Sequence, residues 1–318
     1  MKWVAWRQSR LELIMGLVVL AGLAAFLVPV GLQKLALFKD LGLPTISSTA
    51  AGYDTLSQQF LNSYQRLNMN TVVTLISFAP LIIGALLAVP IIIEFEQRTY
   101  RLAWTQSVTR GRWMVTKFGF ALIAAVVFSA LLSVLMRWWL APQESLTGPF
   151  NNFFQHGIVP LAYAVFALAV ALAVGALSRR TTLAVILALV VCVAAVAGVG
   201  SELRPHYMTP VEQVTTVFLK PPLPTSATPS AGTLKIVTQI PDGAWVVDQY
   251  FIDASGNRLS NINMQMLNGS TQDTLRQVVE YQPAYRYWPF QGIEASIFFG
   301  MSAMLLGTTV GVVKRRMR

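Results

Sequence analysis

The chain has 318 residues, of which 54% are hydrophobic and only 12% are charged, and its formal net charge at pH 7 is +10. This composition excludes intrinsic disorder and argues against a soluble enzyme, because soluble domains carry about 25% charged residues. The basic excess would indicate nucleic acid only if it formed a patch on a water-exposed face. A single cysteine, Cys192, excludes an intrachain disulfide and a cysteine-based metal site.

Six apolar segments are long enough to cross a bilayer, which takes about 20 helical residues. They cover residues 11–32, 71–93, 118–140, 154–178, 181–200 and 288–313. The first is longer than the apolar part of a signal peptide and no cleavage site follows it, so we expect a membrane helix there. The predicted fold class is therefore an all-α polytopic membrane protein with six transmembrane helices.

The basic residues predict the orientation of these helices. With the N-terminus inside, 14 of the 24 Lys and Arg residues lie on the inner side, in segments 1–10, 94–117, 179–180 and 314–318. The outer segments hold ten basic and ten acidic residues and are neutral. We therefore expect both termini to be cytoplasmic, in a multi-pass protein of the cell membrane, and we do not interpret the charge as a nucleic-acid site.

Three parts follow from this arrangement. Residues 1–200 comprise an N-terminal interfacial helix and the first five spans, residues 201–287 form an outer domain, and residues 288–318 form the sixth span and a basic tail. Around residues 234–237 and 245–252 the outer domain is predicted to form strands, with a turn at 254–257. A short helix is expected over 270–281, so we predict a small mixed α/β extracytoplasmic domain. Another short helix is expected around 57–67, in the outer segment 33–70.

Small residues recur every fourth position in the spans, at Ala167, Ala171 and Gly175 and at Gly84 and Ala88. Such spacing lets helices approach closely in lipid. It indicates either ordinary packing within the chain or a face for a second copy.

Charges within the spans are scarce. Arg137 and Glu294 lie toward the outer ends of the third and sixth spans. Either each side chain reaches the headgroup region, or the two form an outer salt bridge that joins these spans. Neither arrangement supplies a proton path.

Catalytic, cofactor-binding and metal-binding motifs are absent from the sequence, including a phosphate-binding loop. His156 and His206 lie in outer segments with no partner at a ligand spacing, so we interpret them as surface or interfacial histidines. The chain is therefore not expected to be an enzyme, and any ATP-hydrolysing machinery belongs to another chain.

The inner segment 94–117 is the most distinctive part of the cytoplasmic side. Read as a helix that begins at Glu94, it carries acidic residues early and Arg98 and Arg101 later, which suits the helix dipole. Tyr100, Ala103 and Trp104 form an apolar stripe. Such an amphipathic helix either lies on anionic lipid or inserts into a soluble partner.

Three stretches resemble one protein family. Segment 94–117, with Glu94-x-Glu96-x-x-Thr99, resembles the loop after the second helix in type-2 permeases of ATP-binding-cassette (ABC) transporters. Residues 3–12 resemble the amphipathic N-terminus of a bacterial subfamily of these permeases, and residues 281–294 resemble the stretch before its sixth helix.

The resemblance implies a half-transporter. It implies a second permease copy, identical or related, and two cytoplasmic ABC ATPase subunits that bind ATP and Mg, whereas this chain binds no cofactor. The segment 94–113 would include a coupling helix that contacts the ATPase, with Glu94, Glu96, Arg98, Arg101, Trp104, Arg110 and Arg112 as the coupling residues. In many relatives the outer segment between the last two helices is short, so the role of 201–287 stays open.

The leading hypothesis is the permease subunit of an ABC exporter for an amphipathic or hydrophobic substrate, such as a drug, a lipid or an antimicrobial peptide. A membrane-anchored sensor whose outer domain binds a ligand is the alternative, but it predicts a cytoplasmic signalling domain and the longest inner segment is 94–117. An intramembrane enzyme would need paired polar groups that the spans lack.

Overall fold

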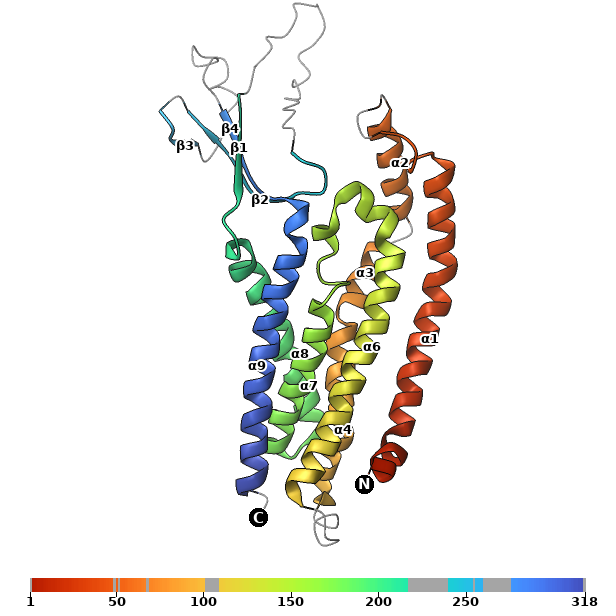
Figure 1. Ribbon diagram of the computed structural model, residues 1–318, viewed down its shortest axis with the longest axis vertical. Coiled ribbons are helices and arrows are strands. Elements are labelled where there is room, and N and C mark those ends of the chain that lie inside the picture. Colours follow the sequence, from red (N-terminus) through yellow and green to blue (C-terminus); the bar gives the residue numbers. More distant parts are fainter. Residues whose placement is uncertain are drawn as a thin grey trace, which may run out of the picture.

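The computed structural model describes residues 2–47, 50, 52–66, 69–100, 109–216, 240–253, 255–259 and 276–316. Within these residues, six helices are long and apolar enough to cross a membrane, as predicted. They form an upright bundle in which the first helix begins and the last helix ends at the same end (Figure 1). We call this the basal end, and we call the opposite end, which carries a small sheet, the distal end.

Most of the helices run beyond the apolar segments from which they were predicted, whereas the fourth and fifth are slightly shorter than their segments. The third span, expected over 118–140, is a helix from Arg110 to Thr147, and the second span is divided at Phe78, where Pro80 occupies the first turn of the next helix. Proline suits a first turn because its missing N–H has no intrahelical partner there. The helices are α1 (Lys2–Asp40), α2 (Tyr53–Arg66), α3 (Met69–Ser77), α4 (Ala79–Gln97), α6 (Arg110–Thr147), α7 (Val159–Ser178), α8 (Thr181–Gly198) and α9 (Tyr287–Arg316). Short turns are η1 (Pro149–Asn152), η2 (Val199–Leu203), η3 (Arg204–His206) and η5 (Ala284–Arg286).

Helix α7 is the centre of the bundle. It packs against α4, α6, α8 and α9, and all side chains from Ala162 to Leu172 are buried. A helix that is apolar on every side is expected to be enclosed by other helices. In contrast, α1 lies at the edge of the bundle against α6 and exposes Leu17, Val18 and Val19 (Figure 1).

The small residues of α4 and α7 let these two helices touch. A Cβ atom at Gly84 would lie 2.0 Å from the carbonyl oxygen of Ala164, and one at Gly175 would lie 2.6 Å from Cγ1 of Ile92. Both distances are too short for real Cβ contacts. The small residues repeated every fourth position therefore pack α4 against α7 of the same chain. This confirms the interpretation that they serve packing within the chain.

The distal sheet has four antiparallel strands in the order β1-β4-β2-β3. They are β1 (Val211–Thr216), β2 (Trp245–Ile252), β3 (Arg258–Leu259) and β4 (Arg276–Gln282). The predicted strand over 245–252 is confirmed, and β1 was not expected in the proline-rich start of the domain. Gly256 lies between β2 and β3 with a φ of 84°, within the predicted turn, whereas the predicted strand at 234–237 lies outside the described residues.

The helix expected over 270–281 is wrong from residue 276 onward, because these residues form β4. Strand β4 pairs with β1 on one side and β2 on the other. Val278 and Val279 are buried there, and β-branched side chains favour a strand once neighbours cover both edges. Among the described residues from 211 to 282 no helix is found, so this part of the predicted mixed domain is a sheet.

The sheet rests on the connection between α6 and α7. Gly148 and Gly243 both have positive φ angles, 82° and 74°, and a Cβ atom on Gly148 would lie 2.4 Å from Cα of Gly243. Beside them, Trp245 stacks on Phe150 with ring centroids 5.6 Å apart. Two close backbones and one aromatic pair thus connect the sheet to the bundle.

We expect Gly84→Ala to destabilise the bundle by at least about 1–3 kcal/mol, the usual cost of overpacking, because the new methyl group meets backbone rather than a mobile side chain. Thermal unfolding of the purified protein in detergent measures this loss. Gly119→Ala on α6 is the matched control, since nothing lies within 4 Å of a Cβ atom there. Equal melting temperatures for the two variants would contradict the close α4–α7 contact.

Candidate functional site

The predicted coupling residues Glu94 and Glu96 lie in the last turn of α4. The expectation that a new helix begins at Glu94 is wrong: the membrane helix continues to Gln97 and ends at Arg98, which adopts the left-handed conformation with a φ of 57°. The helix continues because both carboxylates have partners on neighbouring helices.

Glu94 joins α4 to α6. Its Oε1 atom lies 2.6 Å from Nζ of Lys117, and both side chains are largely buried, with exposed fractions of 18% and 12%. A charge pair with this little solvent is screened less than a surface pair. The contact therefore holds the end of α4 against the first turns of α6.

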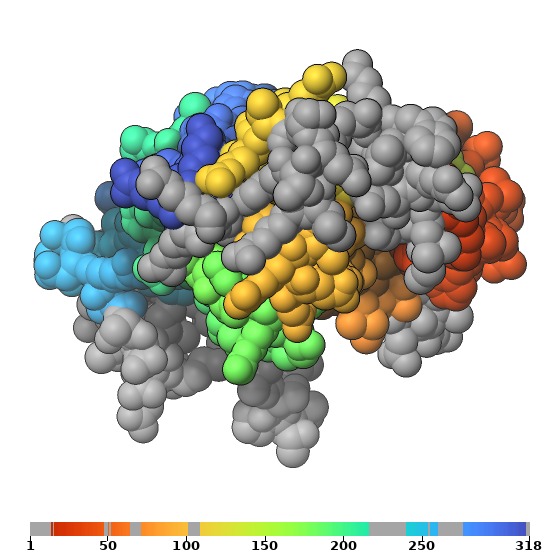
Figure 2. Space-filling model, turned by 90° about the horizontal axis from the view of Figure 1, so that it is seen from below, coloured from red at the N-terminus to blue at the C-terminus, as the bar shows by residue number. Residues whose placement is uncertain are grey.

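Glu96 joins α4 to α8. Its Oε2 atom accepts hydrogen bonds from the backbone N–H of Thr181 at 3.0 Å and from the Thr181 hydroxyl at 2.5 Å. Thr181 is the first residue of α8, and the N-cap residue Arg180 makes no side-chain cap there. A carboxylate at a helix N-terminus is favoured by the helix dipole, so Glu96 caps α8 from another helix. Figure 2 shows the end of α4 beside the turn between α7 and α8 on the basal face.

The chain returns from this connection at Thr109, the N-cap of α6, whose hydroxyl accepts from the backbone N–H of Arg112 at 3.4 Å. Phe95, Tyr100 and Trp113 are buried at the same place, with ring centroids about 6 Å apart in the pairs Phe95–Tyr100 (6.3 Å) and Phe95–Trp113 (5.9 Å). Aromatic packing thus holds both ends of the connection.

The remaining predicted coupling residues divide into two groups. Arg98 and Arg112 are exposed at the basal end and Arg110 is half-buried. Arg101 and Trp104 lie outside the described residues, as do all residues from 101 to 108 of the predicted coupling segment 94–113.

Neither alternative for Glu294 is found: it forms no salt bridge with Arg137 and does not reach the surface, because it is buried and pairs with Arg204. The Arg204 guanidinium donates from Nε to Oε2 at 2.9 Å and from Nη2 to Oε1 at 2.7 Å. The Glu294 side chain is fully buried in α9. Two hydroxyls complete its shell: Tyr207 donates to Oε2 at 3.2 Å and Tyr163 donates to Oε1.

Arg204 also lies between two aromatic rings, with its guanidinium carbon 4.0 Å from the centroid of Phe153 and 4.3 Å from that of Phe154. The cluster connects the end of α8, α7, α9 and the segment before α7. Burial raises the pKa of Tyr207, and the Glu294 carboxylate raises it further, so this hydroxyl stays a donor. Sequence reasoning missed Arg204 because it placed residues from 201 onward in a solvated domain. The sequence does contain an indication of this role: Arg204 directly follows an apolar run, and that run ends near the depth of Glu294.

A second buried network holds the start of α7. The Gln291 side chain of α9 accepts from the backbone N–H groups of Ile158 at 3.0 Å and Val159 at 2.9 Å, where no local side chain caps the helix. His156, expected at the surface, is fully buried: its Nδ1 lies 3.0 Å from the Tyr287 hydroxyl and its Nε2 contacts Glu144. His206 is exposed, as predicted.

Among the residues described, no group of three or more His, Cys, Asp and Glu side chains is placed to hold a metal ion. The two clusters are held together by hydrogen bonds and ion pairs and serve to position helices.

Comparison with known sequences identifies one family. The sequence model of the family described as "ABC-2 membrane transporter related" matches residues 17–204, which is more than half of the chain. The matched range contains the segment 94–117 and excludes residues 3–12 and 281–294. No curated protein and no solved structure matches the chain.

We expect Arg204→Met to lower the free energy of unfolding by about 3–5 kcal/mol, because it leaves the Glu294 carboxylate buried without its counter-ion. The double variant Arg204→Met/Glu294→Gln should recover most of this loss, since the neutral amide leaves no buried charge: its oxygen accepts from one tyrosine and its NH2 group donates to the hydroxyl oxygen of the other. Chemical or thermal unfolding in detergent measures both values. The control is Arg258→Gln, which breaks an exposed pair with Asp248 and should change stability by at most about 1 kcal/mol. If the double variant instead loses the sum of what the two single variants lose, Arg204 and Glu294 do not stabilise each other.

Proposed function

The chain belongs to the ABC-2 membrane transporter related family, and from this membership we propose that it is the permease subunit of an ATP-driven exporter. The single observation that carries the proposal is the family match over residues 17–204, which includes five of the six membrane helices. Two copies of this chain, or this chain and a related one, would enclose the substrate path, with two cytoplasmic ABC ATPase subunits at the basal end.

The distribution of charge supports this orientation. The basal end carries the exposed Arg98 and Arg112, the Arg179–Arg180 turn between α7 and α8, and Lys314 and Arg315 at the end of α9. Loops rich in Lys and Arg stay on the cytoplasmic side of membrane proteins. In the proposed arrangement the basal end is cytoplasmic and the sheet is extracytoplasmic.

The contacts of the α4–α6 connection support a coupling role for this corner. A partner that pushes on residues 98–109 pushes on α4 and α6 together, because Glu94 and Lys117 join them. Glu96 passes the same displacement to α8. We therefore propose that Glu94, Glu96, Arg98 and Arg110 transmit ATPase movement, together with Arg101, Trp104 and Arg112.

The composition of the membrane helices supports an amphipathic or hydrophobic cargo, such as a drug, a lipid or an antimicrobial peptide. The charges that do lie at membrane depth are engaged in joints between helices, as in the Arg204–Glu294 pair. ATP and Mg are proposed to bind the partner ATPase, whose hydrolysis drives the export.

The test of the proposed function is co-expression with the candidate ABC ATPase subunits of the same organism, followed by purification through a tag on this chain. We expect one ATPase to co-purify and its hydrolysis rate to change when the complex is reconstituted in lipid. If no ABC ATPase binds or responds, the chain is not an ABC permease.

In that complex, we expect Glu94→Lys and Lys117→Glu each to lower the permease-dependent hydrolysis rate by about threefold to tenfold. These changes correspond to the loss of about 0.7–1.4 kcal/mol of coupling through the broken pair. The swapped double variant should restore most of the rate, and co-purification should stay unchanged in all three. Arg258→Gln in the distal sheet is the control. A double variant no better than either single one would show that the ion pair does not transmit the movement.

A further inference from the structure

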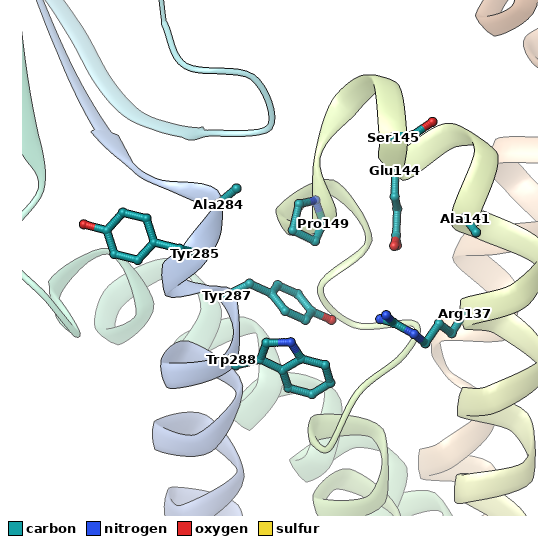
Figure 3. Close-up of a pocket in the computed structure, with 9 residues that line it drawn as sticks. All are labelled: Arg137, Ala141, Glu144, Ser145, Pro149, Ala284, Tyr285, Tyr287 and Trp288. Carbon is teal, nitrogen blue, oxygen red and sulfur yellow. The ribbon is translucent and has the colours of Figure 1, made fainter. Parts of the chain in front are cut away.

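A pocket of about 410 Å³ lies between α6 and α9 at the distal end of the bundle. Its walls include Arg137 and Glu144 of α6, Pro149 of η1, Tyr285 of η5, and Tyr287 and Trp288 at the start of α9 (Figure 3). Ligand pockets in proteins have volumes of about 300–1,000 Å³, so this one has room for a small polar group. Glu144 and Tyr287 both contact His156 in the network described above, and the pocket between their side chains stays open.

Arg137 brings an available positive charge to this pocket. Figure 3 shows its guanidinium directed toward Glu144, Tyr287 and Trp288. Its contact is with the Trp288 ring, whose centroid lies 6.0 Å away, and among the described residues it makes no hydrogen bond or ion pair. A guanidinium with unused donors suits a phosphate or a carboxylate, which it binds through two parallel hydrogen bonds.

Glu144 brings a negative charge to the same pocket. One oxygen, Oε1, contacts the buried His156, whose other nitrogen is held by Tyr287. The second oxygen has no hydrogen-bond partner among the described residues and is available to a donor. Glu144 and Arg137 are seven residues apart on the same face of α6, and no ion pair joins them among the described residues, so both charges face the pocket.

Aromatic rings complete the pocket. Tyr285 is 74% exposed and Trp288 is 51% exposed, an unusual exposure for large rings that no other part of the described chain covers. Each ring lies near a guanidinium of this chain, Trp288 near Arg137 at 6.0 Å and Tyr285 near Arg286 at 5.9 Å, so the rings shape the pocket and the two charged side chains define its chemistry. Trp288, with the exposed Trp138 of α6, also matches the belt of aromatic residues found where membrane helices leave the hydrocarbon. The pocket therefore lies at the depth of the lipid head groups.

We propose that this pocket binds a zwitterionic head group of the phosphoethanolamine type, with its phosphate on Arg137 and its ammonium on Glu144. The Glu144 carboxylate would repel a purely anionic group, and the Arg137 guanidinium would repel a purely cationic one. The two charges therefore favour a ligand that carries both a negative and a positive group. The head group belongs either to a resident membrane lipid or to a free compound with the same chemistry.

The test uses the full-length chain in nanodiscs that contain equal amounts of phosphatidylethanolamine and phosphatidylglycerol. Native mass spectrometry after release into detergent counts the lipids that stay bound. We expect phosphatidylethanolamine to be retained in preference to phosphatidylglycerol. Arg137→Gln and Glu144→Gln should each lower its retention by about tenfold, the size of a lost hydrogen bond to a charged group.

Two controls keep the result specific. Arg258→Gln and Glu212→Gln remove the same charges from the sheet, at exposed positions outside the pocket, and should retain lipid as the unmodified chain does. Glu144→Gln keeps an oxygen that accepts from His156, and the melting temperature of each variant reports whether the fold is preserved. Competition by soluble glycerophosphoethanolamine would show that the site also accepts free compounds, and its failure to compete would assign the site to lipid.

The proposal is overturned if the two lipids are retained equally, or if the Arg137 and Glu144 variants bind like the unmodified chain. Stronger retention of phosphatidylglycerol by Glu144→Gln together with equal retention by the unmodified chain would instead indicate an anion site. No ATPase enters this experiment, so its outcome is independent of the test of the exporter.

Discussion

The contact between α4 and α7 at Gly84 is the constraint on which the rest of the bundle depends. A glycine hydrogen faces the carbonyl oxygen of Ala164, so the two backbones lie closer than side chains would allow. In lipid there is no hydrophobic force between helices, and close packing of small residues replaces it. With α4 fixed on one side of α7, the helices α6, α8 and α9 occupy its remaining sides.

Because other helices enclose α7, the backbone N–H groups of its first turn are far from water and need hydrogen-bond acceptors within the protein. An unsatisfied backbone group in such a place costs several kcal/mol. Gln291 of α9 meets this requirement with one amide oxygen, and its amide nitrogen donates to the carbonyl of Phe153 at 2.8 Å. The position of α9 thus follows from the hydrogen-bonding needs of α7.

Charged side chains join helices at two levels of the bundle. Near the basal end Glu94 and Glu96 tie α4 to α6 and α8, and near the distal end Glu294 ties α9 to Arg204 and α7. Between these levels the described side chains are mainly apolar, and hydroxyls such as that of Ser302 bond within their own helix. A bundle joined at both ends in this way is suited to transmit movement along its length, as the proposed permease requires.

The sequence by itself determined the six spans, the basic end and strand β2, because each is a property of one continuous segment: its hydrophobicity, its charge or its alternation. The partner of Glu294, the burial of His156, the end of α4 at Gln97 and strand β4 in place of a helix were decided by the tertiary structure. Each of these depends on the depth and rotation of two elements that are far apart in the chain, as Arg204 and Glu294 are. A segment pattern shows that Glu294 needs a partner at membrane depth, and only the packing of α8 and α9 around α7 shows that this partner is Arg204 and leaves Arg137 to face the open pocket.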